Sequence, residues 1–117
     1  MTDLDQARTQ EQTARIRELN DQLRISHTGS SLVTTSGVLA LGIYLNQAIL
    51  IAIAAYDAFD EDNDSFGEHD FGLVEVASKE VLFKINYYDN DLRFHSPDPA
   101  DPAVARRIMT IFLPEEY

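Results

Sequence analysis

The residues of this chain that could do chemistry gather in one stretch, which reads Asp-Glu-Asp-Asn-Asp-Ser-Phe-Gly-Glu-His-Asp-Phe-Gly from Asp60 to Gly72. The stretch holds six carboxylates and a histidine between two apolar segments. Such groups can bind a divalent metal, move protons, or present negative charge to a basic partner. The sequence therefore offers three kinds of chemistry at one place.

The first kind of chemistry is metal binding. Asp60, Asp62 and Asp64 have the 1, 3, 5 spacing of a calcium loop, but Ser65 stands where that loop needs glycine and Phe71 where it needs a bidentate glutamate. A site of another type, in a divalent-metal-binding module or a metal-dependent hydrolase, is the alternative that we keep. Its ligands would be Asp62, Asp64, Glu68, His69 and Asp70.

The second kind of chemistry is acid–base catalysis by His69, which has a carboxylate on either side in sequence. The chain has no cysteine and no Gly-x-Ser-x-Gly turn that would supply a nucleophile. We therefore favour a non-enzymatic protein with a structural histidine. Its ring would bond to a backbone carbonyl or to Asp70, while Phe71 enters the core.

The third feature is the uneven distribution of charge. The formal net charge is −11, and residues 25–78 carry −8 of it because they include no Lys or Arg. Eight carboxylates cannot be buried together without cations, since each unpaired buried charge is strongly destabilising. We expect them to face water, a metal or a basic partner, on a loop where Asn63 or Asp64 forms an Asx turn.

The acidic composition argues against direct binding to nucleic acid or to a membrane, where Lys and Arg supply most of the affinity. A basic or nucleic-acid-binding protein fits better, because closely spaced carboxylates can occupy a groove built for phosphates. A tyrosine beside acidic residues further along the chain is also typical of an interface. The candidate partner-binding residues are Asp57, Asp60, Glu61, Asp62, Asp64, Glu68, Asp70, Tyr88, Asp89 and Asp91.

The whole chain has the size of one domain, spanning residues 1–117, and 44% of its residues are hydrophobic, which is typical of a globular protein. Its polar, acidic start differs from a signal peptide, so we expect a cytoplasmic protein. Residues 3–24 favour a helix that Gly29 caps. The first 13 residues have few apolar side chains and are expected to fray or extend from the body.

Residues 45–59 form the clearest helix, apolar on nearly every side, and we expect it to be buried between the sheet and the first helix. The nineteen uncharged residues 38–56 approach the roughly 20 that cross a bilayer. Gly42, Asn46, Gln47 and the lack of nearby Lys or Arg argue against a membrane span. Because this helix has more apolar surface than a small sheet covers, the sequence allows a homodimer.

Alternating apolar residues predict a sheet after the acidic stretch, with strands at 71–77, 81–88 and 92–95 and turns at 78–80 and 89–91. A short β-branched strand is predicted at 32–35. Asp101-Pro102 is a typical helix start, although residues 104–113 could also form a strand. The predicted fold is α+β, with two or three helices packed on a small antiparallel β-meander.

Several motifs resemble those of one family: Asn63-Asp64, Gly67-Glu68-His69-Asp70-Phe71-Gly72, Lys84-Ile85-Asn86-Tyr87-Tyr88-Asp89, Ser96-Pro97-Asp98-Pro99-Ala100-Asp101-Pro102 and Glu116-Tyr117. From about Arg15 to Tyr117 the chain resembles an uncharacterised bacterial domain of unknown function, found mostly in alphaproteobacteria and often encoded on plasmids and other mobile elements. Asn86 departs from the family pattern, where an aspartate is expected. The resemblance implies a small cytoplasmic protein of a class rich in inhibitors of host defence.

Two hypotheses of function follow. The first is a non-enzymatic protein without a cofactor, whose acidic face from Asp57 to Asp70 occupies a basic site on another protein. Its concrete form is an anti-defence inhibitor that mimics nucleic acid, against a restriction or CRISPR complex. The alternative is a divalent-metal-binding module or metal-dependent hydrolase that uses the Asp60–Asp70 loop.

Overall fold

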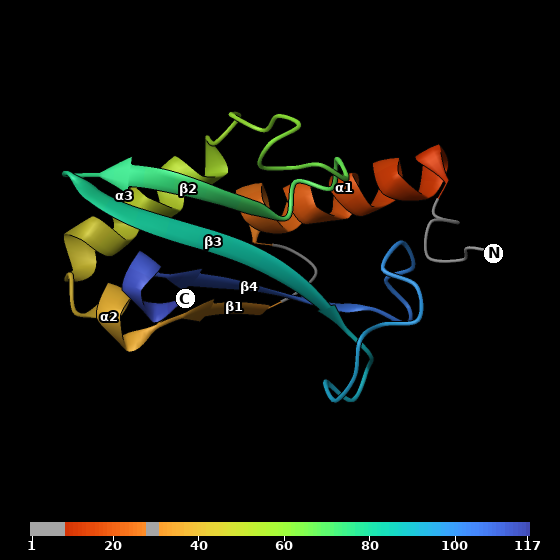
Figure 1. Cartoon of the computed structure of the whole chain (residues 1–117). Coiled ribbons are helices and arrows are strands. Elements are labelled where there is room, and N and C mark those ends of the chain that lie inside the picture. The colour runs from red at the N-terminus through yellow and green to blue at the C-terminus, as the bar shows by residue number, and fades with distance from the viewer. Residues whose placement is uncertain (1–8, 28–30) are drawn as a thin grey trace.

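The computed structural model describes residues 9–27 and 31–117, and the structural statements below refer to these ranges. One sheet contains the four strands in the order β1-β4-β3-β2. The strands are β1 (Ser31–Thr34), β2 (Phe71–Val76), β3 (Lys79–Tyr88) and β4 (Arg106–Phe112). The helices are α1 (Gln10–Ser26), α2 (Ser36–Leu39), α3 (Ile43–Ala54) and the 3-10 helix η2 (Pro114–Glu116). Helices α1 and α3 cover one face of the sheet and η2 lies against the other (Figure 1), which confirms the α+β class.

The sheet is mixed, so the predicted pure antiparallel meander is wrong. Strand β3 pairs antiparallel with β2 and with β4, but β1 pairs with β4 in parallel, from Ser31 opposite Ile108 to Thr34 opposite Ile111. Parallel neighbours need a crossover connection. Here the crossover contains α2, α3 and the whole β2–β3 hairpin.

The last element, which the sequence left open between helix and strand, is strand β4. Met109 and Ile111 face the core while Ile108 and Thr110 face away, so the burial follows a period of two. Residues 92–95, predicted as a strand, form only a single bridge between Tyr88 and His95. Strand β4 takes the place beside β3 that the predicted strand would have filled.

The β2–β3 hairpin turns at Ala77 and Ser78, one residue earlier than predicted. Both residues have positive φ, 51° and 65°, as the central residues of a type I′ hairpin turn do. Helix α1 begins at Gln10 after a capping box formed by Thr9 and Gln12, and it ends at His27 in the left-handed conformation. The predicted cap at Gly29 and the frayed residues 1–8 lie outside the described residues.

Helix α3 ends at Ala54, five residues before the predicted end. The cause is a tertiary contact: Nη1 of Arg24, from α1, donates to the carbonyls of Ile53, Ala54 and Tyr56 at 3.0, 3.1 and 3.0 Å. A guanidinium at this position satisfies carbonyls that the end of a helix leaves free. The next residues can therefore turn back toward the core, and Phe59 packs edge-on against Tyr56.

Only one side of α3 is buried, so the prediction of a fully buried central helix is wrong. Ile49 and Ile53 belong to the core with Leu23 of α1 and Phe83 of β3, whereas Ile51 on the opposite side is exposed. Within residues 9–27 and 31–117, no helix has both the length and the apolar composition that crossing a bilayer requires.

The assignment of β4 as a strand can be tested with one pair of substitutions. Met109→Ala removes a fully buried side chain and should lower the free energy of unfolding by about 2–5 kcal/mol, whereas half-buried Ile108→Ala should cost less. Urea unfolding of both variants measures the difference. A helix with Val104, Ile108, Ile111 and Phe112 on its inner face would give the reverse order.

Candidate functional site

The acidic stretch forms the loop between α3 and β2, and its first half is a capped turn. Oδ1 of Asp60 accepts the N–H groups of Asp62 and Asn63 at 2.8 and 3.1 Å. Asn63 in turn accepts the N–H of Asp60 at 3.0 Å and donates to the carbonyl of Ala58 at 2.9 Å. The loop therefore contains an Asx turn, but it forms at Asp60 and not at the predicted Asn63 or Asp64, and it fixes the backbone that carries the outer carboxylates.

The second half of the loop is held by the buried carboxylate of Asp64. Its Oδ1 accepts the N–H groups of Glu68 and His69 at 3.0 and 3.1 Å. His69 has φ 58°, a conformation that costs energy in a residue with a side chain, so the surrounding contacts must hold it. Contrary to prediction, Asp64 faces the loop's own backbone rather than water or a partner.

His69 ties the loop to helix α1. Its ring stacks on Phe59 at a centroid distance of 3.9 Å and an angle of 4°, and Nδ1 lies 3.0 Å from Oδ1 of Asp21. The same Asp21 oxygen accepts Nη2 of Arg24 at 2.9 Å. A structural histidine is thus what the geometry provides, but its partner is Asp21 and not Asp70.

Glu68 points into the molecule and joins a buried polar network. Its Oε1 accepts the hydroxyl of Tyr87 at 2.8 Å, and its backbone carbonyl accepts Nδ2 of Asn20 at 3.0 Å. Nδ2 of Asn20 also donates to Tyr87 Oη at 2.8 Å, and Asn20 Oδ1 accepts Nε of Arg107 at 2.7 Å. Burial, followed by the negative charge of Glu68, raises the pKa of Tyr87. Glu68 is thus a second predicted surface acid that lies inside.

Asp70 is half-buried at the start of β2. Burial of its carboxyl raises its pKa above the ordinary value, the nearby charge of Glu68 adds to the effect, and Lys84 opposes it. Its backbone carbonyl accepts the N–H of Ile85 at 2.8 Å. Of the inner acids, Asp64 and Glu68 therefore hold the fold through their carboxylates, whereas Asp70 bonds to β3 through its backbone carbonyl.

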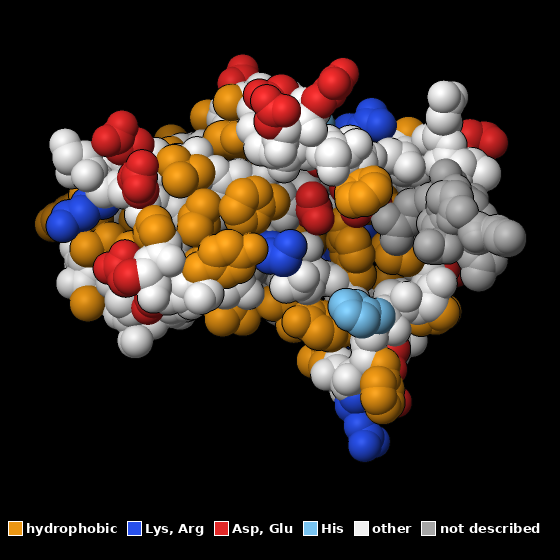
Figure 2. Space-filling view, viewed as in Figure 1, with side chains coloured by type: hydrophobic (Ala, Val, Ile, Leu, Met, Phe, Trp, Pro, Cys, Tyr) orange, Lys and Arg blue, Asp and Glu red, His pale blue; other side chains and the backbone are white. Residues whose placement is uncertain are grey.

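The outer carboxylates of the loop are Asp57, Asp60, Glu61 and Asp62, all exposed. Figure 2 shows acidic side chains along the upper edge of the molecule, over the loop that joins α3 to β2. Among the described residues, no Lys or Arg forms an ion pair with any of these four. A hollow of about 410 Å³ lies beside them, lined by residues that include Arg17 of α1 and the exposed Phe66.

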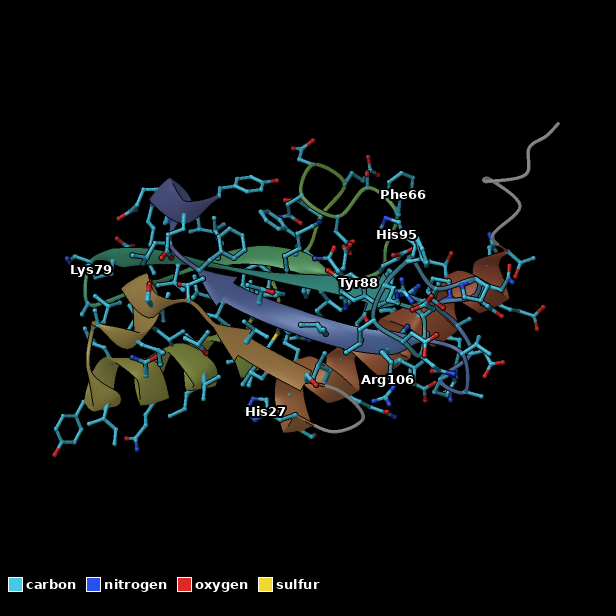
Figure 3. All side chains as sticks on the ribbon, turned by 90° about the horizontal axis from the view of Figure 1, so that it is seen from below. His27, Phe66, Lys79, Tyr88, His95 and Arg106 are labelled. Carbon is cyan, nitrogen blue, oxygen red and sulfur yellow. The ribbon has the colours of Figure 1, made fainter. Side chains whose placement is uncertain are left out.

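The remaining candidates, Tyr88, Asp89 and Asp91, lie elsewhere. Figure 3 shows Tyr88 with His95 and Arg106 at the end of β3 that is remote from Lys79. The loop that follows Tyr88 projects on the side of the molecule opposite the acidic loop (Figure 1). The carboxylate of Asp89 accepts the N–H of Arg93 at 3.0 Å, and this bond lowers its pKa. The predicted partner-binding residues therefore form two separate surfaces.

The metal-binding alternative finds no ready site in the part of the chain that the structure describes, because no three His, Asp or Glu side chains there form a group that could hold an ion. Of the predicted ligands, Asp64 and Glu68 bond to other protein groups, and His69 bonds to Asp21. The hypothesis that the loop binds a metal stays a prediction, tested below.

The residues that anchor the loop were missed by the sequence analysis, which assigned no role to Asn20, Asp21 or Arg24 of α1 or to Arg107 of β4. One signal was available on α1. Arg17, Asn20, Asp21 and Arg24 have the three- and four-residue spacings that place side chains on one face of a helix. Arg17 belongs to the same face, since its Nε donates to the carbonyl of Gly67 at 2.8 Å.

The fold and the site define a small α+β domain whose acidic loop is fastened to its first helix by buried polar contacts. The chain belongs to the DUF3768 family, described as a protein of unknown function, whose sequence profile matches residues 34–116. No curated protein and no solved structure matches the chain. The matched residues include the whole acidic loop, whereas Asn20, Asp21 and Arg24 precede them.

Substituting His69 separates a structural histidine from a metal ligand. His69→Ala removes the stack on Phe59 and the bond to Asp21, so we expect it to lower the free energy of unfolding by about 1–3 kcal/mol. His69→Asn is the control for backbone strain, because asparagine tolerates positive φ. The thermal unfolding midpoint of His69→Ala should lie below that of the unsubstituted protein by the same amount with EDTA and with calcium, magnesium, manganese or zinc. An ion that raises the midpoint of the unsubstituted protein alone would show that the loop binds a metal.

The raised pKa of Asp70 predicts a pH effect on stability. The folded protein holds this proton more tightly than the unfolded chain, whose pKa is near the ordinary 3.8, so stability falls as pH rises through the folded-state pKa. Asp70→Asn cannot ionise and should raise the melting temperature at pH 7, with the gain disappearing near pH 3. Exposed Asp62→Asn is the control, and a lower melting temperature of Asp70→Asn at pH 7 would contradict the prediction.

Proposed function

We propose that this protein is a non-enzymatic cytoplasmic binding protein that uses the outer carboxylates of its acidic loop to occupy a basic site on another protein. The observation that carries the proposal is the contrast within the loop. The carboxylates of Asp64 and Glu68 are bonded to the protein, whereas Asp57, Glu61 and Asp62 are exposed and have no cationic partner among the described residues. Negative charge of this kind is available to a partner.

The hydrogen bonds within the loop support the proposal. The backbone under the outer acids is bonded by Asp60 and Asn63 within the loop and by Asp64 at its second half. Ordering a loop on binding would subtract from the affinity, so a loop already ordered binds more tightly for the same contacts. The loop can therefore present its charges without a large entropic loss.

The surroundings of the outer acids support a basic partner in particular. The residues that line the hollow beside the loop include the exposed acids Asp60 and Glu61 and the exposed aromatic residue Phe66, and the arginine among them, Arg17, already donates to the carbonyl of Gly67. Carboxylates bond to guanidinium groups, and an aromatic face attracts them through its quadrupole. An arginine or lysine from the partner would find both kinds of contact there.

The mobile-element context that the sequence resemblance implies suggests which basic partner to test. Enzymes of host defence bind nucleic acid through basic clefts, and an acidic protein can block such a cleft by replacing the phosphates. The finer form of the proposal is therefore an anti-defence inhibitor that mimics nucleic acid. Restriction endonucleases and CRISPR effector complexes are the partners to examine first.

Charge reversal at Glu61 and Asp62 tests the proposal. Both side chains are exposed, so Glu61→Lys/Asp62→Lys leaves the buried contacts of the loop intact. We expect the unsubstituted protein to slow DNA cleavage by its target enzyme, less strongly as salt is raised, and the double variant to need roughly tenfold more protein or worse for the same effect. Cleavage rates of a restriction endonuclease and of a CRISPR complex provide the measurement.

The matched control is Glu80→Lys/Glu115→Lys, which changes the net charge equally at exposed positions away from the loop. Inhibition that is lost in the loop variant and kept in this control supports a site on the loop. Equal loss in both variants would mean that only overall charge matters. Inhibition unchanged by the loop reversal would rule out the loop as the binding surface.

A further inference from the structure

The outer side of α3 carries a row of bulky apolar side chains that no other element of residues 9–27 and 31–117 covers. Ile43, Tyr44 and Ile51 are 68%, 83% and 70% exposed. With Gln47 between them they lie on one side of the helix, since residues three and four apart are neighbours on a helix surface. We call these four residues the α3 stripe. Single exposed apolar residues are common on proteins, whereas several that lie close together are a feature of interaction sites.

The charge of the chain limits what can cover the α3 stripe. The net charge is −11, yet no Asp, Glu, Lys or Arg occurs between Arg24 and Asp57. Two copies of so acidic a protein repel each other over most of their surface and can meet at low electrostatic cost only where charge is missing. An anionic membrane is a poor occupant, because residues 25–56 offer no Lys or Arg to attract its head groups.

The α3 stripe is also complementary to itself. Gln47 is its one polar member, with Tyr44 three residues before it and Ile51 four residues after it. If two α3 helices pack antiparallel about a two-fold axis near Gln47, Tyr44 of each copy meets Ile51 of the other. The same axis brings the two Gln47 amides together, and each amide can donate to and accept from its counterpart.

We infer that the chain forms a homodimer through the α3 stripe, with its two α3 helices antiparallel. In the antiparallel orientation the dipoles of the two helices point in opposite directions, which is electrostatically favourable. It also separates the two acidic loops, because each loop follows the carboxyl end of its own α3 and the two ends lie at opposite ends of the helix pair. A parallel pair would place the two loops side by side, where their charges repel.

Sedimentation velocity over a range of concentrations tests the inference. We expect the unsubstituted protein to sediment with twice the mass of the chain, and Ile51→Asp to sediment as a monomer, because it places two carboxylates in the apolar interface. Gln47→Glu, a milder change at the axis, should raise the dimer dissociation constant at least tenfold. Phe94→Asp is the matched control: Phe94 is 69% exposed but belongs to the loop between β3 and β4, which projects away from α3 (Figure 1), so this variant should stay dimeric.

Cross-linking tests the position of the axis. The chain contains no cysteine, so Gln47→Cys introduces one thiol per copy, which should form an intermolecular disulfide rapidly under mild oxidation. Glu61→Cys, on the acidic loop, should not. A monomeric unsubstituted protein would overturn the inference, as would a dimer that Ile51→Asp leaves intact. Circular dichroism shows that each variant is folded, which its exposed position leads us to expect.

Discussion

The buried side-chain amide of Asn20 is the contact on which the arrangement of the molecule depends. Its Nδ2 bonds to the backbone of the acidic loop and to Tyr87 of β3, and its Oδ1 bonds to Arg107 of β4. A buried amide is costly without partners and rigid with all of them. Because its partners come from three separate segments, the loop, β3 and β4 must all be in place around α1 before the amide is satisfied.

This constraint explains why the acidic loop contains two kinds of carboxylate. The carboxylate of Asp64 bonds to the backbone of the loop itself, and the carboxylate of Glu68 bonds to the hydroxyl of Tyr87. Their contacts allow the exposed acids, such as Glu61 and Asp62, to project from a fixed backbone. The number of acids in the sequence therefore overstates the charge that a partner can reach, and the distinction between the two kinds is a matter of position and not of residue type.

The sequence predicted the parts of the molecule whose cause is local. The hairpin follows from alternation, and the Asx turn in the loop follows from the bonding of a side chain to nearby backbone, although it forms at Asp60 and not at the predicted Asn63 or Asp64. The pairing of β1 with β4 produces no pattern in the neighbouring sequence from which it could be predicted. The same holds for the end of α3, because Arg24, whose side chain bonds to the last carbonyls of α3, belongs to another helix. The bond of His69 to Asp21 joins residues 48 positions apart, so neighbouring acids in the sequence pointed to the wrong partner.

The parallel pairing of β1 and β4 also has a consequence for how the protein folds. The β2–β3 hairpin is formed by neighbouring residues and can assemble early, whereas Ser31 must find Ile108 across most of the described chain. Until that closure occurs, one edge of β4 offers unpaired backbone groups beside apolar side chains, which is a template for association with other unfinished chains. Strand β1, a segment of only four residues, therefore pairs with the open edge of β4. Once it has paired, that edge is no longer available for association, and the interval in which the protein is most prone to aggregate ends.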